Sequence, residues 1–250
     1  MQYPVATYRI QFHKDFNFER FEQAIDYLSL LGISTVYASP IFEAVPGSTH
    51  GYDGVNPLRI NPEIGTEQQL RAISGKLKDA GINWLQDIVP NHMAFHPNNI
   101  WLMDVLEKGR ESKYAGFFDC TSINKDDTEK LIVPFLGSSL EDAVHKGELK
   151  LVVQRGKFIF QYYDSYYPIN DLSKKEILSL TEDERSAVEQ VNQNPEFMLK
   201  LAHMQHYRLC HWQETDHTIN FRRFFTINGL ICLNIQDKNV FEAYHQYIKQ

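Results

Sequence analysis

The chain has 250 residues, of which 43% are hydrophobic and 23% are charged, a composition typical of globular proteins with a buried core. Its formal net charge is −7. An acidic chain repels phosphate, so nucleic acid is excluded as a partner and a neutral ligand such as a sugar is favoured. The chain does not open with a basic segment followed by an apolar one, and no apolar run is long enough to span a membrane. We therefore expect a cytoplasmic protein with no membrane contact.

The cysteines and aromatic residues narrow the chemistry further. Cys120, Cys210 and Cys232 are far apart and include no CxxC pair, so neither a disulfide framework nor a zinc site is predicted. Aromatic residues make up 13% of the chain, which suits either an aromatic core or a set of surface platforms for stacking. We predict no cofactor and no metal.

The first 40 residues predict a strand, a helix and a second strand. Residues 7–12 alternate as a strand, Asn17 can cap a helix, and Gly32 ends it. Between these two positions, apolar side chains recur at helical spacing at Phe18, Phe21, Ile25, Leu28 and Leu31. Residues 34–38 read as a buried strand stopped by Pro40. Two strands joined by a helix predict a parallel pair with a right-handed crossover.

A long loop, a helix and a third strand follow. The loop, residues 41–65, is longer than a strand–helix connection needs and leaves the carboxyl end of a strand, where such loops are usually functional. Residues 66–80 predict a helix capped by Thr66, with Leu70, Ile73 and Leu77 on one face, and residues 82–89 predict the third strand. The order favours an α/β barrel or a doubly wound sheet.

The alternation breaks after the third strand. Residues 149–153 and 158–163 predict a hairpin, and residues 174–191 and 196–212 predict two helices. We interpret this region as an insertion that emerges from strand three. Residues 239–249 are amphipathic and suit the helix that follows that strand.

Two polar segments lie at the predicted strand ends. Asp87-Ile88-Val89-Pro90-Asn91-His92 places a carboxylate, an amide and an imidazole where they can bind sugar hydroxyls; the alternative is a buried structural acid and a capping histidine. Gly47-Ser48-Thr49-His50-Gly51-Tyr52-Asp53 has glycines that allow a sharp turn presenting Tyr52 to the C–H face of a sugar. The alternative for this second segment is an ordinary turn.

The first segment resembles the strand-three motif of the α-amylase family. Residues 39–53, 59–65, 101–109, 205–209 and 219–225 are similar to the corresponding stretches of the maltooligosyltrehalose synthases within that family. Together these matches run along nearly the whole chain. The resemblance implies the N-terminal part of a TIM-type (β/α)8 barrel, with about three of the eight strands and a mixed α+β insertion after strand three. The implied domains are residues 1–92 in the barrel, 93–220 in the insertion and 221–250 returning to the barrel.

The resemblance also implies an activity: isomerisation of the reducing-end α-1,4 bond of a maltooligosaccharide to an α,α-1,1 bond by retaining intramolecular transglycosylation. Tyr52 would stack on the sugar and His92 would hydrogen-bond its hydroxyls. Asp87 would brace the site, and Asp53 would chiefly anchor its own loop. The further substrate-binding residues implied are His50, Asn91, Arg222 and Arg223; the two arginines can alternatively pair with carboxylates.

One motif of the family is missing. Its nucleophile lies in a Gly-x-Arg-x-Asp pattern, and Asp216 and Asp237 lack the arginine. We therefore expect no catalytic residue within residues 1–250, an incomplete fragment without turnover, and self-association through an open barrel edge. Thr218, Thr226 and Gln236 stand where the family has acids, and Asn234 where it has an arginine, as in a subfamily or a relaxed copy.

Three alternatives stay open at this point. The strand-three motif also fits an α-amylase-family hydrolase or a 4-α-glucanotransferase, because it does not choose among these activities. A non-catalytic oligosaccharide-binding remnant is the second alternative. The third is a metal site at His203, His206, His211 and His217, of which the first two are three residues apart on a predicted helix.

Overall fold

The computed structural model describes residues 4–120 and 130–249. Contacts within the chain divide it into two compact units, the first made of Met1–Ala94 with Ile235–Gln250 and the second of Phe95–Asn234. Among the described residues, no helix has the length and apolar character that crossing a membrane requires. Because each unit has its own set of strands and helices, each is described by itself.

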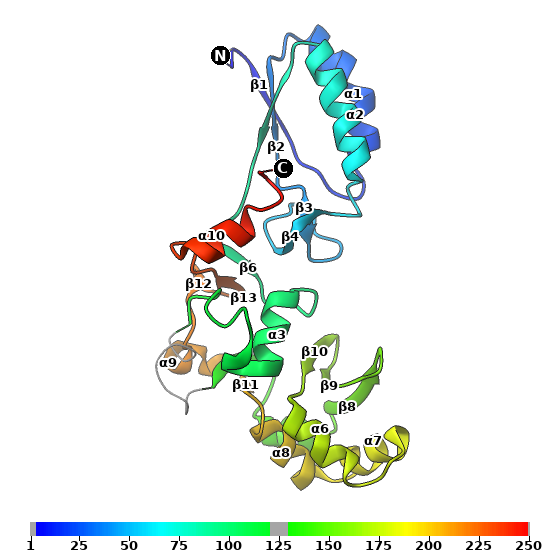
Figure 1. The fold of residues 1–250 in the computed structure, drawn as a ribbon, viewed down its shortest axis with the longest axis vertical. Coiled ribbons are helices and arrows are strands. Elements are labelled where there is room, and N and C mark those ends of the chain that lie inside the picture. The colour runs from blue at the N-terminus through cyan, green and yellow to red at the C-terminus, as the bar shows by residue number, and fades with distance from the viewer. Residues whose placement is uncertain (1–3, 121–129, 250) are drawn as a thin grey trace. The chain divides into compact units, whose positions relative to one another are not determined.

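The first unit is built on a parallel sheet (Figure 1). Its strands are β1 (Thr7–Ile10), β2 (Thr35–Ala38) and β5 (Asn83–Gln86), in the order β1-β2-β5. Both pairs are parallel, and the register aligns Arg9 with Tyr37 and Tyr37 with Leu85. The predicted parallel strands are therefore present, although each is shorter than predicted, the second by only one residue.

Helices α1 (Phe18–Leu30) and α2 (Glu67–Asp79) pack on one face of this sheet. Asn17 caps α1, and Thr66 caps α2 in a capping box with Gln69. Phe12 lies at the centre of the core, 1% exposed, among four other aromatic rings. The other core residues from the strands and helices include Ile10, Phe18, Phe21, Ile25, Leu28, Val36, Ala38, Ile73 and Leu77.

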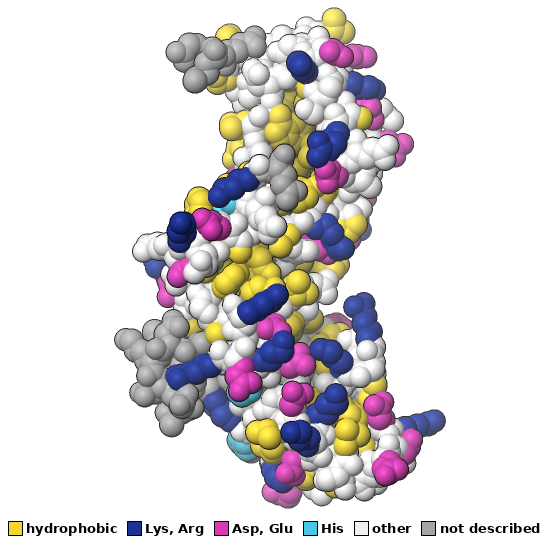
Figure 2. Space-filling model, viewed as in Figure 1, with side chains coloured by type: hydrophobic (Ala, Val, Ile, Leu, Met, Phe, Trp, Pro, Cys, Tyr) yellow, Lys and Arg dark blue, Asp and Glu magenta, His cyan; other side chains and the backbone are white. Residues whose placement is uncertain are grey.

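The opposite face of the sheet carries different side chains. Since successive residues of a strand point to opposite faces, Arg9, Tyr37 and Leu85 lie side by side away from the helices. Leu85 is 55% exposed, and Figure 2 shows hydrophobic side chains at the surface over this sheet. Strands β1 and β5 are the outer strands, so the sheet of the described residues is open and does not close into a barrel.

The long segment after β2 contains a hairpin that the sequence did not predict. Strand β3 (Phe42–Ala44) pairs antiparallel with β4 (Gly54–Ile60). Strand β3 has only three residues, and β4 contains Pro57 and begins at Gly54, two residue types that disfavour strands. The hairpin encloses residues 45–53, which include the second predicted polar segment.

Two short elements complete the first unit. Strand β6 (His92–Ala94) follows the third sheet strand, and α10 (Lys238–Tyr244) begins after its cap residue Asp237. The hydroxyl of Tyr244 donates to the backbone oxygen of Val89 at 2.7 Å, which ties the helix to the segment that bears the strand-three motif. Helix α10 ends five residues earlier than the predicted helix over 239–249.

The second unit is a mixed α+β assembly. Its hairpin of β8 (Leu149–Gln154) and β9 (Lys157–Tyr162) is the predicted one, and β10 (Ser165–Pro168) adds a third strand. The unit's other elements are α3 (Ile100–Lys108), η1 (Gly109–Glu111), β7 (Leu131–Leu136), α5 (Leu140–His145), α6 (Asp171–Leu178), α7 (Glu184–Asn192), α8 (Pro195–His203), β11 (Tyr207–His211), η2 (Trp212–Glu214), α9 (Thr215–Thr218), β12 (Arg223–Phe224) and β13 (Ile227–Cys232).

Both long helices predicted for this unit were wrong in extent. The first is two helices, because α6 ends at Leu178 and Asp183 caps a new start for α7. The second ends at His203, where the buried Gln205 side chain donates to the backbone oxygen of Leu201 at 2.6 Å. The next residues form β11, which pairs parallel with β7. Tertiary pairing with a distant strand thus overrides a local helical pattern.

Candidate functional site

The site is centred on the loop Gly47–Asp53, here called the platform loop. Gly47 and Gly51 have φ angles of 80° and 76°, a backbone conformation that residues with a Cβ rarely adopt. The Ser48 hydroxyl accepts the backbone N–H of Gly51 at 3.1 Å and donates to the Asp53 carboxylate. The loop is therefore a closed turn that holds Tyr52 at its end.

Gly51 also lies against the chain that leaves β2. A Cβ added at Gly51 would lie 2.6 Å from the backbone oxygen of Pro40, whereas one added at Gly47 would meet nothing within 4 Å. We expect Gly51→Ala to lower the free energy of unfolding by at least about 1 kcal/mol more than Gly47→Ala does. Urea unfolding of both variants measures the difference, and equal losses would show that the approach to Pro40 does not constrain the loop.

Tyr52 and the strand-three motif meet at Asp87. The Tyr52 hydroxyl donates to Asp87 Oδ2 at 2.6 Å, and the hydroxyl of Tyr37, on β2, donates to the same oxygen at 2.9 Å. These hydrogen bonds raise the pKa of both phenols above their usual value, because a phenolate beside a carboxylate is disfavoured. The carboxylate thus holds two neutral tyrosines at the carboxyl end of the sheet.

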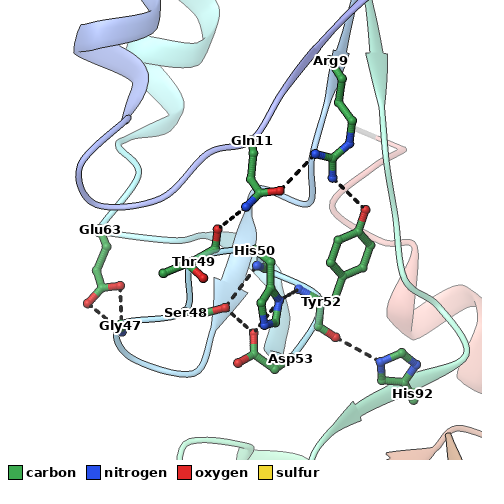
Figure 3. A network of polar contacts seen from close by, with 11 residues as sticks. Arg9, Gln11, Gly47, Ser48, Thr49, His50, Tyr52, Asp53, Glu63 and His92 are labelled. Carbon is green, nitrogen blue, oxygen red and sulfur yellow. Dashed lines mark hydrogen bonds and ion pairs between the residues drawn. The ribbon is translucent and has the colours of Figure 1, made fainter. Parts of the chain in front are cut away.

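Arg9 completes this cluster, and the sequence analysis missed it. One guanidinium nitrogen of Arg9 donates to the Tyr52 hydroxyl at 3.2 Å, and the other donates to Gln11 Oε1 at 3.0 Å. The Gln11 amide then donates to the backbone oxygen of Thr49 at 2.9 Å (Figure 3). A signal was present in the sequence, since Arg9 and Gln11 are polar residues that alternate with the buried Ile10 and Phe12.

His92 is buried beneath the platform loop, with 3% of its surface exposed. Its Nε2 lies 3.0 Å from the backbone oxygen of Tyr52, and its Nδ1 lies 3.2 Å from Oδ1 of the exposed Asn91. A carbonyl oxygen only accepts, so Nε2 carries the proton that it donates to Tyr52. Burial lowers the pKa of the His92 imidazole below its usual value, because the charged ring would lose its hydration.

The lowered pKa of His92 predicts a loss of stability in acid. The unfolded chain protonates this histidine near its ordinary pKa of about 6.5, and the folded chain only at lower pH. Between the two pKa values the unfolded chain binds more protons, so the free energy of unfolding falls as the pH drops through that window. Urea unfolding at pH 7.5 and 5.5 should show a larger drop for the wild type than for His92→Gln. His50→Gln, at an exposed histidine of the same unit, is the control, and equal drops in wild type and His92→Gln would contradict the prediction.

The remaining predicted site residues fall into two groups. In the platform loop, His50 Nδ1 accepts the backbone N–H of Tyr52 at 3.0 Å and lies 3.7 Å from Asp53 Oδ1. Arg222 and Arg223 belong to the second unit. There, Arg222 lies 3.6 Å from the carboxylate of Asp119, and Arg223 donates to Asn228 Oδ1 at 2.6 Å.

Among the described residues, His203, His206 and His211 do not gather as the ligands of a metal ion. His203 is the last residue of α8, His206 lies beyond it, and His211 ends β11. The side chain of His217 lies outside the described residues, as does that of Asp216. Within the part of the chain that the structure describes, no three His, Cys, Asp or Glu side chains come together as metal ligands would. The three cysteines are free and buried.

Comparison with known proteins agrees with this arrangement. The family model "Alpha amylase, catalytic domain" matches residues 20–152, slightly more than half of the chain. The "Putative maltooligosyl trehalose synthase" of Mycobacterium tuberculosis is 33% identical over 98% of this chain and 29% of its own length. The maltogenic alpha-amylase of Bacillus acidopullulyticus is 40% identical over 38% of this chain and 15% of its own length.

Solved structures give the same family and extend the likeness to both units. A glycosyltrehalose synthase superposes with a TM-score of 0.85 at 38% identity, over 98% of this chain and 32% of its own. The maltooligosyltrehalose synthase from Arthrobacter ramosus superposes with a TM-score of 0.79 at 30% identity, over 98% of this chain and 29% of its own. The chain thus spans about 30% of the length of these relatives. With its parallel βαβ unit, its strand-three motif and a match to the catalytic domain over more than half its residues, the chain belongs to the α-amylase family and is an α/β portion of its TIM-type barrel fold.

Proposed function

We propose that this chain is part of an enzyme that isomerises the reducing-end α-1,4 bond of a maltooligosaccharide to an α,α-1,1 bond. The likeness to trehalose-forming synthases over 98% of the chain supports the proposal. The likeness to the maltogenic amylase covers only 38% of the chain, so it leaves most of the chain unmatched. The extent of the match is thus the observation that favours a synthase over a hydrolase.

The proposed reaction has two displacement steps that together retain the configuration of the anomeric carbon. A carboxylate attacks the anomeric carbon, the α-1,4 bond breaks, and a carboxylic acid protonates the leaving oxygen. The released glucose then attacks the covalent intermediate through its own anomeric hydroxyl, which gives its proton to the residue that acted as the acid in the first step, and the nucleophilic carboxylate is released. Water must be kept out between the two steps, because it would attack the intermediate and release a shortened sugar.

Within this scheme the described residues bind and orient the sugar. Tyr52 would stack on the C–H face of a glucose unit, with its tilt held through Asp87. His92, Asn91 and His50 would hydrogen-bond hydroxyl groups around it. Because Nε2 of His92 donates to the backbone oxygen of Tyr52, Nδ1 is the acceptor nitrogen of the neutral ring and would accept a hydrogen bond from a sugar hydroxyl.

The larger architecture is also a proposal. We place residues 1–92 in the barrel, residues 93–220 in an insertion after strand three, and residues 221–250 on the return to the barrel. Arg222 and Arg223, which belong to the second unit, are the further proposed substrate-binding residues. The outer strands β1 and β5 of the open sheet are the edges through which the isolated chain would self-associate.

Incubating the protein that contains this chain with maltopentaose tests the proposed reaction. We expect reducing ends to disappear without shortening of the oligosaccharide, because the terminal glucose is reattached through its anomeric carbon. Accumulation of glucose and maltose would identify a hydrolase, and longer oligosaccharides would identify a 4-α-glucanotransferase. Either result would overturn the proposal.

The same assay on residues 1–250 alone tests whether this chain carries the catalytic carboxylates. The sequence contains no Gly-x-Arg-x-Asp pattern, so we expect this chain to produce no trehalose-terminated sugar. Turnover by a homogeneous sample of residues 1–250 would show that the catalytic carboxylates are already within it.

A further inference from the structure

Strand β1 reaches the platform loop through the side chain of Arg9. Arg9 and Tyr52 are 43 residues apart in sequence, yet the guanidinium donates to the phenol oxygen at 3.2 Å. The Cζ atom of Arg9 also lies 5.8 Å from the centre of the Tyr37 ring, within the range of a cation–π contact. Arg9 therefore lies over one tyrosine of the Asp87 pair and donates to the other.

The two contacts of the Tyr52 hydroxyl differ in kind. The oxygen donates its one proton to Asp87 at 2.6 Å and accepts from Arg9 at 3.2 Å. A phenol can satisfy both bonds at once because it has one donor and acceptor lone pairs besides. Since the two partners come from β1 and from the end of the third sheet strand, together they fix the position of the ring edge.

The backbone of the platform loop is held at three further points. Gln11 donates to the oxygen of Thr49 at 2.9 Å, and Glu63 accepts the N–H of Gly47 at 3.0 Å. The Nε2 atom of His92 donates a hydrogen bond to the backbone oxygen of Tyr52. Figure 3 shows these contacts converging on the loop from separate segments of the chain. With the loop backbone fixed, the ring of Tyr52 retains only its side-chain torsions, and the hydroxyl contacts restrict those.

We propose that Arg9 is a positioning residue, which acts through the hydroxyl of Tyr52 to present that ring at one tilt to the sugar. The inference rests on the proposed function of Tyr52 as a sugar platform. Without the Arg9 bond the ring would have more torsional freedom in the unbound protein, and binding would have to remove it. Ordering one such side chain corresponds to roughly a three- to tenfold loss of affinity.

A double-mutant cycle on maltopentaose binding separates this role from a general structural one. The variants are Arg9→Met, Tyr52→Phe, which keeps the ring, and the two combined. We expect Arg9→Met to weaken binding about three- to tenfold in the wild type but less than about twofold in the Tyr52→Phe background, because the bond is already gone there. Arg71→Met, at an exposed arginine that pairs with Glu67 on α2, should leave binding unchanged. Equal losses in both backgrounds would overturn the proposal.

A second measurement needs no sugar. With 3-fluorotyrosine incorporated, the fluorine resonance of Tyr52 is assigned by its absence in Tyr52→Phe, and the other tyrosine resonances report folding. We expect Arg9→Met to move the Tyr52 resonance by more than its linewidth while Arg71→Met does not. An unmoved resonance would overturn the role of Arg9. If the wild type fails to bind maltopentaose, the proposed function fails, and the fluorine spectrum still decides whether Arg9 positions the ring.

Discussion

Replacing Phe12 by alanine is expected to lower the free energy of unfolding of the first unit by about 3–5 kcal/mol. Phe12 is 1% exposed, and its ring lies 5.3–6.5 Å from those of Phe16, Phe18, Phe21 and Trp84. The backbone N–H of residue 12, which donates to the Ser39 hydroxyl at 2.9 Å, is kept in the variant. The loss therefore comes from the aromatic side chain and the cavity that it leaves.

A probe confined to the first unit is needed because two compact units can unfold separately. Hydrogen exchange of peptides from β1, β2 and β5 during a urea titration supplies it. Leu30→Ala is the matched control, since Leu30 lies on α1 with 90% of its surface exposed. A loss below about 1 kcal/mol for Phe12→Ala would mean that the aromatic cluster does not dominate this core.

Replacing Tyr52 by alanine is expected to weaken maltopentaose binding about 100-fold, or about 3 kcal/mol. The variant removes both the stacking face and the hydroxyl that joins Arg9 to Asp87, and central aromatic side chains commonly account for losses of 2 kcal/mol or more. Titration calorimetry of the protein that contains this chain measures the change. Tyr52→Phe keeps the ring and should lose only about three- to tenfold.

Tyr27→Ala controls for the loss of an aromatic ring as such. Tyr27 lies on α1 and is 62% exposed, so its replacement should leave binding unchanged. If Tyr52→Ala binds as tightly as the wild type while its circular dichroism is unaltered, Tyr52 is not the platform and the proposed site is misplaced.

Local sequence patterns predicted the part of the fold that supports the site. Asn17 and Thr66 cap the helices that they were expected to cap, and the strands joined by those helices are parallel. These features depend on residues close together in the chain, where capping chemistry and hydrophobic spacing act directly. The family resemblance added the catalytic class, which no local pattern contains.

The missed features depend on contacts between distant residues. Tyr207 and Leu209 fit a helix that continues from α8, but β7 pairs with them as a strand. In the sequence, Arg9 resembles an ordinary exposed residue. Its contact with Tyr52 forms only when the platform loop folds back toward β1. In the same way, the strand-three motif places Asp87 at the site but does not indicate that Tyr37 shares its carboxylate.

The alternation of residues 9–12, at the end of β1 and just beyond it, has a consequence for how this gene can change. The even-numbered residues Ile10 and Phe12 contribute to the core, whereas the odd-numbered residues Arg9 and Gln11 reach the platform loop. The two functions of this stretch therefore depend on the alternation of its side chains. Inserting or deleting one residue between Arg9 and Phe12 would break this alternation, because the residues on one side of the change would then point to the opposite face. Point substitutions can alter one function at a time. A length change in this short stretch disturbs both the core and the platform loop. In a library of single-codon insertions and deletions, we therefore expect few folded, sugar-binding variants with changes in residues 7–12.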